Sequence, residues 1–178
     1  LFLFSFRHNL FQKYLYDQLS KSERVVFHQA VGEALEAFYS GFTEKIAPQL
    51  ARHFDLAGSV KQAIHYYTLA GRYAIRVSAH HEVIAHVQRA LVLLATLPAS
   101  PERSSQELDL QLLLPTSITA LKGWAAPELD AVYDRALQLC SELTDNVQLV
   151  RTLWMMTVYR MGRSEHDKAE DLIKQLSR

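Results

Sequence analysis

Residues 47–74, APQLARHFDLAGSVKQAIHYYTLAGRYA, decide the fold of this chain. Apolar residues recur there every three or four positions, which is the spacing of a helix rather than of a strand. Gly58 separates two such segments, and the serine after it can begin a second helix. We therefore expect a helix at about 46–57, a tight turn, and a second helix at about 59–70 that packs on the first.

The same period continues through most of the chain after residue 8, and three apolar stripes show it most clearly. They consist of Phe27, Ala30, Val31, Ala34, Leu35 and Phe38; of Val83, Ile84, Val87, Ala90, Leu91 and Leu94; and of Leu129, Val132, Tyr133, Ala136, Leu137 and Cys140. A helix with one apolar stripe packs that stripe on a neighbour. The pattern predicts an all-α protein in which each stripe is covered.

Glycine and proline divide the helices into pairs, because both residues end or start helices readily. The expected pairs are 46–57 with 59–70, 72–79 with 82–96, 105–121 with 127–144, and 147–161 with 164–176. Gly71 is expected to end a helix, and Leu97–Ser105 is expected to be an exposed linker. Pro115 should kink or split the helix that contains it, because proline lacks the N–H that the helix requires.

Several residues predict where helices begin. Two capping boxes are expected, Ser20 with Glu23 and Ser59 with Gln62. In this motif the serine oxygen accepts a hydrogen bond from a free N–H of the first helical turn. Pro127 suits a first helical turn, and Ser164 is expected to start the last helix. LFLFSF, residues 1–6, is better explained as a strand or an extended tail than as a helix.

Apolar residues, most of them small, recur seven positions apart where paired helices should meet. The pairs are Ala63 and Ala70, Val83 and Ala90, and Leu129 and Ala136. Small side chains at this spacing allow close helix approach, as in tetratricopeptide (TPR) hairpins with a period of about 34 residues. The spacing between repeats is irregular in this chain. We expect a TPR-like α-α superhelix, or solenoid, of about four antiparallel hairpins.

Composition indicates an ordinary globular protein and restricts its partners. Of the 178 residues, 49% are hydrophobic and 21% are charged, and 19 basic residues balance 19 acidic ones. A zero formal charge argues against sequence-independent nucleic-acid binding, which needs excess positive charge. Cys140 is the single cysteine, which suits a reducing compartment and a cytoplasmic location. No apolar run reaches the ~20 residues that span a bilayer, so no membrane contact is expected.

Four segments of the chain resemble one known group of proteins. They are FSFRHNLFQKYLYDQLSKSERVVFHQAVGEALEAFY at 4–39, APQLARHFDLAGSVKQAIHYYTLAGRYA at 47–74, EVIAHVQRALVLLATLP at 82–98, and GWAAPELDAVYDRALQLCSEL at 123–143. Together they resemble the helical-repeat region of large multidomain signal-transduction ATPases. That group includes bacterial class III adenylate/guanylate cyclases fused to a predicted ATPase, and LuxR-type transcriptional regulators.

The resemblance implies how the chain is organised and what it does. Residues 1–41 would be a linker, with a short extended start and two helices, that follows an ATPase or winged-helix module, and 42–178 would be the TPR-like repeat domain. The chain would be a fragment that serves as a non-catalytic protein–protein interaction or regulatory scaffold. Its partner would be another protein or the parent's own ATPase or output domains. The sequence contains no G-x-x-x-x-G-K-[ST] phosphate loop, so we expect no enzymatic activity and no cofactor.

Candidate chemistry elsewhere has simpler explanations. His80, His81 and His86 lack the i, i+4 spacing of metal ligands on a helix, so no metal site is expected. Cys140 lies on a core stripe, which favours a buried filler over a nucleophile. His28 is interpreted as a bridge between the first two helices. The other residues singled out are interpreted as structural: His53 as a hydrogen-bonding residue between repeats, Trp124 as a loop anchor, and Trp154 as part of an apolar stripe.

The surface of stacked hairpins remains as the place of function. The first helix of each pair would line a concave face whose polar side chains can hold an extended peptide or a helix. The candidate partner-binding residues are Arg52, His53, Arg72, Arg76, Lys122 and Arg151, with acidic segments as candidate partners.

Two alternatives to the scaffold remain open. One is a helical nucleic-acid-binding domain in which Tyr66, Tyr67 and Tyr73 stack on bases beside Arg72 and Arg76. The other is a small-molecule effector-sensing domain of a transcriptional regulator, with an apolar pocket between hairpins. The identity of the effector and the oligomeric state do not follow from the sequence.

Overall fold

The computed structural model describes residues 9–144 and 146–176, which form ten helices and no strand. The expected extended segment at 1–6 lies outside the described residues. The helices are α1 (Asn9–Gln18), α2 (Lys21–Phe38), α3 (Thr43–Leu56), α4 (Val60–Arg76), α5 (His80–Leu94), α6 (Pro101–Gln111), α7 (Leu114–Lys122), α8 (Glu128–Leu143), α9 (Asn146–Gly162) and α10 (His166–Leu176). The prediction of an all-α protein is confirmed.

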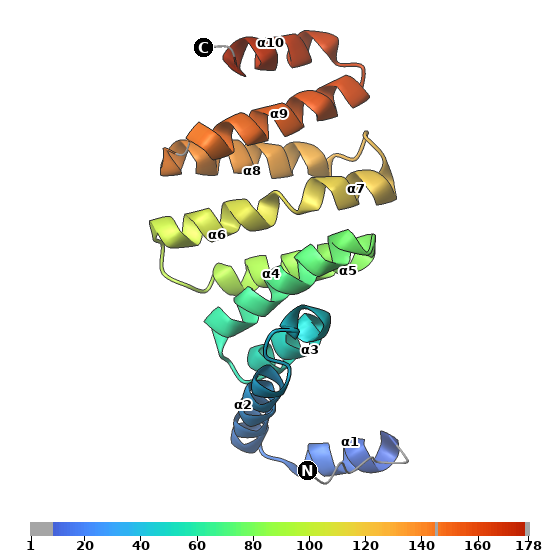
Figure 1. Ribbon diagram of the computed structural model, residues 1–178, viewed down its shortest axis with the longest axis vertical. Coiled ribbons are helices and arrows are strands. Elements are labelled where there is room, and N and C mark those ends of the chain that lie inside the picture. The colour runs from blue at the N-terminus through green and yellow to red at the C-terminus, as the bar shows by residue number, and fades with distance from the viewer. Residues whose placement is uncertain (1–8, 145, 177–178) are drawn as a thin grey trace.

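The helices are stacked in chain order along one long axis, with α1 and α2 at one end and α10 at the other (Figure 1). From α2 onward, each described helix packs mainly on the next one or two helices in the chain. Helices α6 and α7 together form one layer between α5 and α8. Contacts are therefore local in sequence, and the core is drawn out along the stack.

The main core begins where α3, α4 and α5 meet. Leu50 and Phe54 of α3, Ala63 of α4, and Val83 and Val87 of α5 are fully buried. The core continues towards α8 and α9, and a smaller cluster joins α6 to α8. The expected stripes on α5 and α8 are confirmed, and every small residue expected at a helix contact is buried.

The turn between α3 and α4 matches its prediction. Gly58 has a φ of +75°, a conformation that a residue without Cβ adopts readily. The backbone N–H of Ser59 then bonds back to the carbonyl of Phe54 at 2.9 Å. The capping box expected at Ser59 is wrong, because its hydroxyl donates to Gln29 Oε1 of α2 at 2.6 Å and caps nothing.

Helix α4 is longer than expected, which changes the second predicted pair. Gly71 does not end the helix; α4 continues to Arg76 and packs on α5. The reason is that Gly71 is a contact point, since a Cβ there would lie 3.3 Å from Val87 Cγ2. The expected separate helix at 72–79 is therefore wrong.

The region around the prolines also differs from the prediction. The expected linker Leu97–Ser105 is shorter, because Pro101 occupies the first turn of α6 and the Ser100 hydroxyl caps that helix. Pro115 splits the expected helix 105–121, as predicted: α6 ends at Gln111, and α7 begins with Pro115 in its first turn.

Two of the predicted helix starts have clear outcomes. The capping box of Ser20 and Glu23 is confirmed, with the serine oxygen accepting from the Glu23 N–H at 3.2 Å. Ser164 does not start α10. Ser164 has a left-handed φ of +60°. The first helical hydrogen bond instead runs from the N–H of Ala169 to the carbonyl of Glu165.

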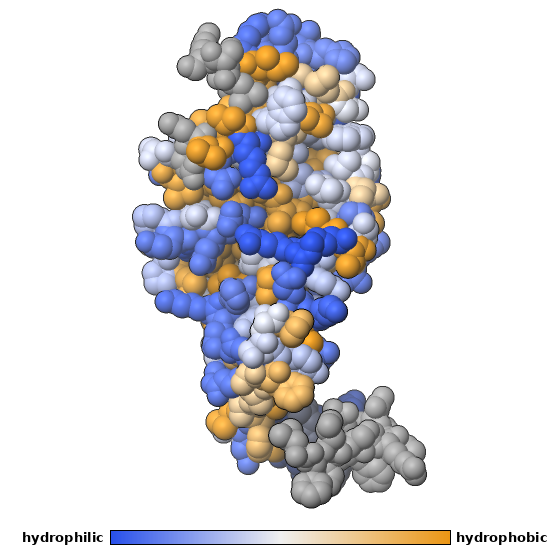
Figure 2. All heavy atoms as spheres, viewed as in Figure 1, coloured by the Kyte–Doolittle hydropathy of each residue, from blue (hydrophilic) through white to orange (hydrophobic). Residues whose placement is uncertain are grey.

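Leu35 of the stripe predicted on α2 packs against the core, but most of that stripe is not covered by the described residues. Phe27 is 54% exposed, Phe38 is 72% exposed and Val31 is 41% exposed. Helix α2 instead turns towards α3 the face that contains Gly32, whose added Cβ would lie 3.0 Å from the Phe54 ring. Apolar colours over the α2 end of the stack are visible in Figure 2.

Candidate interaction surface

The structure distributes the six predicted residues along the stack. Arg52 and His53 lie on α3 and line one pocket. Arg72 and Arg76 lie on α4, the second helix of its pair and not the first, so their expected place on a row of first helices is wrong. The structure places Lys122 at the end of α7 and Arg151 on α9. The six therefore do not line one common pocket.

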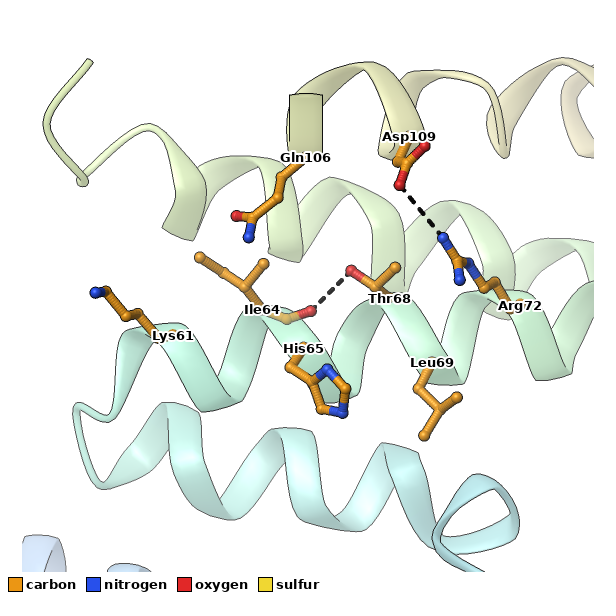
Figure 3. Close-up of a pocket in the computed structure, with 8 residues that line it drawn as sticks. All are labelled: Lys61, Ile64, His65, Thr68, Leu69, Arg72, Gln106 and Asp109. Carbon is orange, nitrogen blue, oxygen red and sulfur yellow. Dashed lines mark hydrogen bonds and ion pairs between the residues drawn. The ribbon is translucent and has the colours of Figure 1, made fainter. Parts of the chain in front are cut away.

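A polar groove lies between α4 and α6 and includes Arg72 (Figure 3). Its volume is about 220 Å³. Arg72 reaches across to Asp109 of α6 at 3.5 Å, and Thr68 donates to the carbonyl of Ile64 in its own helix at 2.8 Å. The remaining lining residues are Lys61, His65 and Leu69 from α4 and Gln106 from α6. The groove is thus closed at one end by an ion pair that spans two helices.

Arg76 and Lys122 are also paired within the chain. Arg76 bonds to Glu44 of α3, and Lys122 bonds to Glu128 of α8. All four side chains are about half exposed, and exposed pairs of this kind stabilise a protein by only ~0–1 kcal/mol. A partner can therefore replace either carboxylate at little cost. Arg151 is exposed and has no ion-pair partner among the residues described.

A second pocket is formed where α1, α2 and α3 meet. Its volume is about 540 Å³. The lining residues are Lys13 and Tyr16 from α1, His28 from α2, and Gln49, Arg52, His53 and Leu56 from α3. Among the described residues, this lining contains two cationic side chains and no carboxylate. We call it the basic pocket.

A chain of hydrogen bonds crosses the basic pocket. The Tyr16 hydroxyl lies 3.0 Å from His28 Nε2, and His28 Nδ1 lies 3.0 Å from His53 Nδ1. His28 therefore joins α1 to α2, and His53 joins this unit to α3, as the sequence predicted for both residues. Because each neutral imidazole carries one N–H, one of the two Nδ1 atoms donates and the other accepts.

Both histidines are kept neutral by their surroundings. Burial lowers the pKa of His28, and the positive charge of Arg52 lowers it further. Burial also lowers the pKa of His53, with additional contributions from His28 and Arg52. A buried cation is disfavoured, and a nearby like charge adds to that cost. At neutral pH the positive charge of the basic pocket therefore comes from its lysine and arginine.

A third, more apolar pocket of about 360 Å³ lies between α7, α8 and α9. Trp124 and Trp154 both line it. Trp124 packs its ring on Gly162, where an added Cβ would lie 2.6 Å from the indole, so its predicted role as an anchor is confirmed. Trp154 lies at helical spacing from Val150, Val158 and Met161 of α9, so it belongs to an apolar stripe as predicted, but this stripe is exposed, with Trp154 itself 61% exposed.

Two of the three tyrosines of α4, Tyr66 and Tyr67, fill space between helices. Tyr66 is 4% exposed, stacks on Phe54 at a centroid distance of 5.5 Å, and donates to Glu36 of α2. Tyr67 donates to Asp55 at 3.1 Å, and burial together with this carboxylate raises its pKa to about 12. Neither ring offers an open face on which several bases could stack.

Cys140, His80 and His86 make local contacts within the helical stack. Within the described residues, no three or more His, Cys, Asp or Glu side chains gather closely enough to hold a metal ion. Cys140 is buried, as expected, with its Sγ 3.6 Å from Thr152 Oγ1. His80 bonds to the hydroxyl of Ser117 at 3.2 Å, and His86 packs beside the ring of Tyr67.

The sequence predicted Arg52 and His53 as binding residues, but it did not predict several of the residues that line the same pocket. Lys13, Tyr16 and Gln49 carry no motif. On α3, the spacing of Gln49, Arg52, His53 and Leu56 is i, i+3, i+4, i+7, which puts these residues on one helix face. That spacing was the available signal, but only the packing of α1 and α2 shows that this face lines a pocket.

No protein-family model matches the chain, and no curated protein matches it either. In the described part of the chain, no helix is both long enough and apolar enough to cross a membrane.

Proposed function

We propose that the chain is a TPR-like α-superhelix that acts as a non-catalytic protein–protein interaction scaffold. The observation that carries this proposal is the arrangement of the helices, which bury one another's contact faces in chain order and leave polar grooves between layers. Repeat proteins stacked in this way present extended binding surfaces. The buried alanines of α4, α5 and α8 at helix contacts are consistent with a TPR-like arrangement.

The polar groove between α4 and α6 is the proposed docking place for a partner segment. Lys61 and Arg72 line it, and hydrophilic residues extend over the middle of the stack on the face shown in Figure 2. An acidic side chain can take the place of Asp109 on Arg72, because that pair is long and exposed. The partner is therefore an extended segment with acidic residues.

We further propose, from the sequence resemblance, that the scaffold belongs to an ATPase-coupled signalling protein. Its parent would be similar to a bacterial adenylate cyclase fused to an ATPase, or to a LuxR-type regulator. The scaffold would bind the parent's own ATPase or output domains, or another protein. Such binding shifts a conformational equilibrium only if the two conformations bind with different affinity.

A titration of residues 1–178 with the ATPase module encoded in the same reading frame tests this function. We expect saturable binding that weakens at least about tenfold in the double variant Arg72→Glu/Arg76→Glu, since each reversal replaces an attraction by a repulsion. Lys168→Glu, an exposed change on α10, is the control and should bind like the parent chain. Absence of binding to the ATPase and output modules of that protein would refute the signalling assignment.

The nucleic-acid alternative has a separate test. Binding to single-stranded DNA or RNA should be weak, because Tyr66 and Tyr67 are used in packing and hydrogen bonding. A steep decrease of log affinity with log salt concentration would favour nucleic acid as the partner. No dependence on salt, or no binding, leaves the protein-interaction proposal in place.

A further inference from the structure

We propose that the basic pocket between α1, α2 and α3 binds a phosphate monoester. This site goes beyond the scaffold function, because it would take its ligand whether or not a protein docks on the α4–α6 groove. The proposal rests on the charges that line the pocket, on the unused hydrogen-bond donors in it, and on its size.

The charges favour a dianion. Lys13 and Arg52 face the same pocket from two helices. Neither has an ion-pair partner in the described part of the chain, whereas Arg72, Arg76, Arg89 and Arg135 all pair with carboxylates. Asp17, the acidic residue of α1, does not line the pocket, and its Oδ1 lies 3.9 Å from Nη2 of Arg24. Two unpaired cations without a lining carboxylate match the two negative charges of a phosphate monoester.

The hydrogen bonds leave donors for the ligand oxygens. If Tyr16 donates to His28 Nε2, then His28 donates from Nδ1 to His53 Nδ1, and His53 must carry its proton on Nε2. That Nε2–H has no partner among the described residues. The Gln49 amide lines the same space. Phosphate has three terminal oxygens that accept such bonds, whereas a carboxylate has two.

The pocket also suits this ligand by its size. About 540 Å³ accommodates a phosphate together with the group that it esterifies. Among the described lining residues, Leu56 is the one aliphatic side chain, and it is 44% exposed. The two cations in the lining favour an anion over an uncharged ligand.

Ligand binding should tighten as the histidines take up a proton. Within the described part of the chain, the charged and titratable groups that line the pocket with His53 are Lys13 and Tyr16 from α1, His28 from α2, and Arg52 from α3. In the free protein, burial and Arg52 lower the pKa of both rings. A bound dianion offsets the positive charge of Arg52 and so raises the pKa of both histidines. One added proton is compatible with the hydrogen-bond chain, because His53 can then donate from both nitrogens.

The experiment uses residues 1–178 with inorganic phosphate and O-phosphoserine as probes. Binding is followed by the NMR signals of the His28 and His53 ring protons and by calorimetry. We expect both rings to shift in a saturable way. Arg52→Gln should lower the affinity about ten- to a hundredfold, as expected for the loss of a charge-assisted hydrogen bond, and Arg52→Lys should restore part of it.

Arg151→Gln is the matched control, since it removes one exposed, unpaired arginine on α9. It should change the affinity by less than about twofold, because remote exposed charges are screened by salt. Circular dichroism of both variants verifies the fold. The proposal is overturned if neither ring shifts at saturating phosphate, or if Arg52→Gln and Arg151→Gln weaken binding equally.

Two further arms identify the source of the phosphate and the role of the histidines. A peptide containing phosphoserine that binds much more tightly than O-phosphoserine indicates a phosphorylated protein, and equal affinity indicates a small metabolite; both results support the site. Sulfate keeps its charge between about pH 5 and pH 8, the range in which histidine titrates. Its affinity should rise on acidification, and an affinity that does not change with pH would exclude the histidines from the site.

Discussion

Helices α2 and α4 have nearly the same length and both carry apolar residues at helical spacing, but they are used differently. In α4, which lies between α3 and α5, Ala63, Ala70 and Ala74 are at most 4% exposed. In α2, which packs mainly on α3, Phe27 and Phe38 are more than half exposed. Amphipathic periodicity shows that a helix has an apolar face, and it does not show which neighbour covers that face.

The faces that α2 and α4 turn to α3 explain the difference. Helix α4 presents buried alanines together with Tyr66, whose ring stacks on Phe54 of α3. Helix α2 presents Gly32 together with polar side chains: His28 bonds to His53 of α3, Gln29 accepts from Ser59 at the start of α4, and Glu36 accepts from Tyr66 of α4. Polar contacts therefore fix the position of α2, whereas hydrophobic burial fixes that of α4.

The largest expected effect is in the core that α3 shares with both helices. Phe54 is fully buried against Tyr66 and Gly32. Phe54→Ala should lower the free energy of unfolding by about 3–5 kcal/mol, because it opens a cavity. Phe27→Ala on α2 should change it by less than about 0.5 kcal/mol, as surface substitutions do. Urea denaturation measures both, and equal losses would show that the α2 face is covered in solution.

The next effect concerns the close approach of α2 to α3. Gly32→Leu should cost about 1–3 kcal/mol, because there is no room for a side chain beside the Phe54 ring. Ala34→Leu, on an exposed position of the same helix, is the control and should be nearly neutral. A neutral Gly32→Leu would mean that α2 moves away from α3 without cost.

A smaller effect is expected from the hydrogen bond between α4 and α2. Tyr66→Phe removes the donor to Glu36, and the expected loss is about 1 kcal/mol, since the carboxylate is only partly buried. Tyr39→Phe, which changes a 38% exposed tyrosine, is the matched control. Thermal unfolding of the two variants and the parent chain gives the comparison. The same loss in both would indicate a general effect of removing a hydroxyl.

The smallest effect is the pH dependence of the α2–α3 contact. The pKa values of His28 and His53 are lowered in the folded chain, so the unfolded chain binds more protons below pH ~6.5. By linkage, the two neutral histidines contribute to the stability of the folded chain above that pH. This contribution is lost as the pH falls through their pKa values in the folded chain. The urea midpoint should thus decrease from pH 7.5 to about 5.5. His28→Gln should reduce this decrease, and an unchanged decrease would assign it to other groups.

Much of the fold was predictable because helical spacing and turn residues act locally. The stripes of α5 and α8, the Gly58 turn, the cap at Ser20 and the split at Pro115 all depend on a few neighbouring residues. The errors lie where a distant contact overrides the local signal. Gly71 looked like a helix end, but it is the point at which α5 approaches α4.

The candidate site was predictable only in part. Arg52 and His53 were found because they are polar residues on an amphipathic helix. Lys13 and Tyr16 were not found, because they lie on α1. Packing and the Tyr16–His28 bond bring that helix next to Arg52 and His53. The pairing of Arg76 with Glu44 likewise joins residues on two different helices, and no spacing rule relates residues in separate elements.

The amino-acid sequence by itself determined that this protein is helical, where most of its helices begin and end, and which face of each is apolar. These properties follow from the 3.6-residue period and from the backbone preferences of glycine, proline and serine. Only the tertiary structure decided which faces are covered, that α2 packs through its polar side, and that two cations and two histidines from three helices share a pocket. Those outcomes depend on how whole helices fit together, and the free energy of that fit is not a property of any one segment.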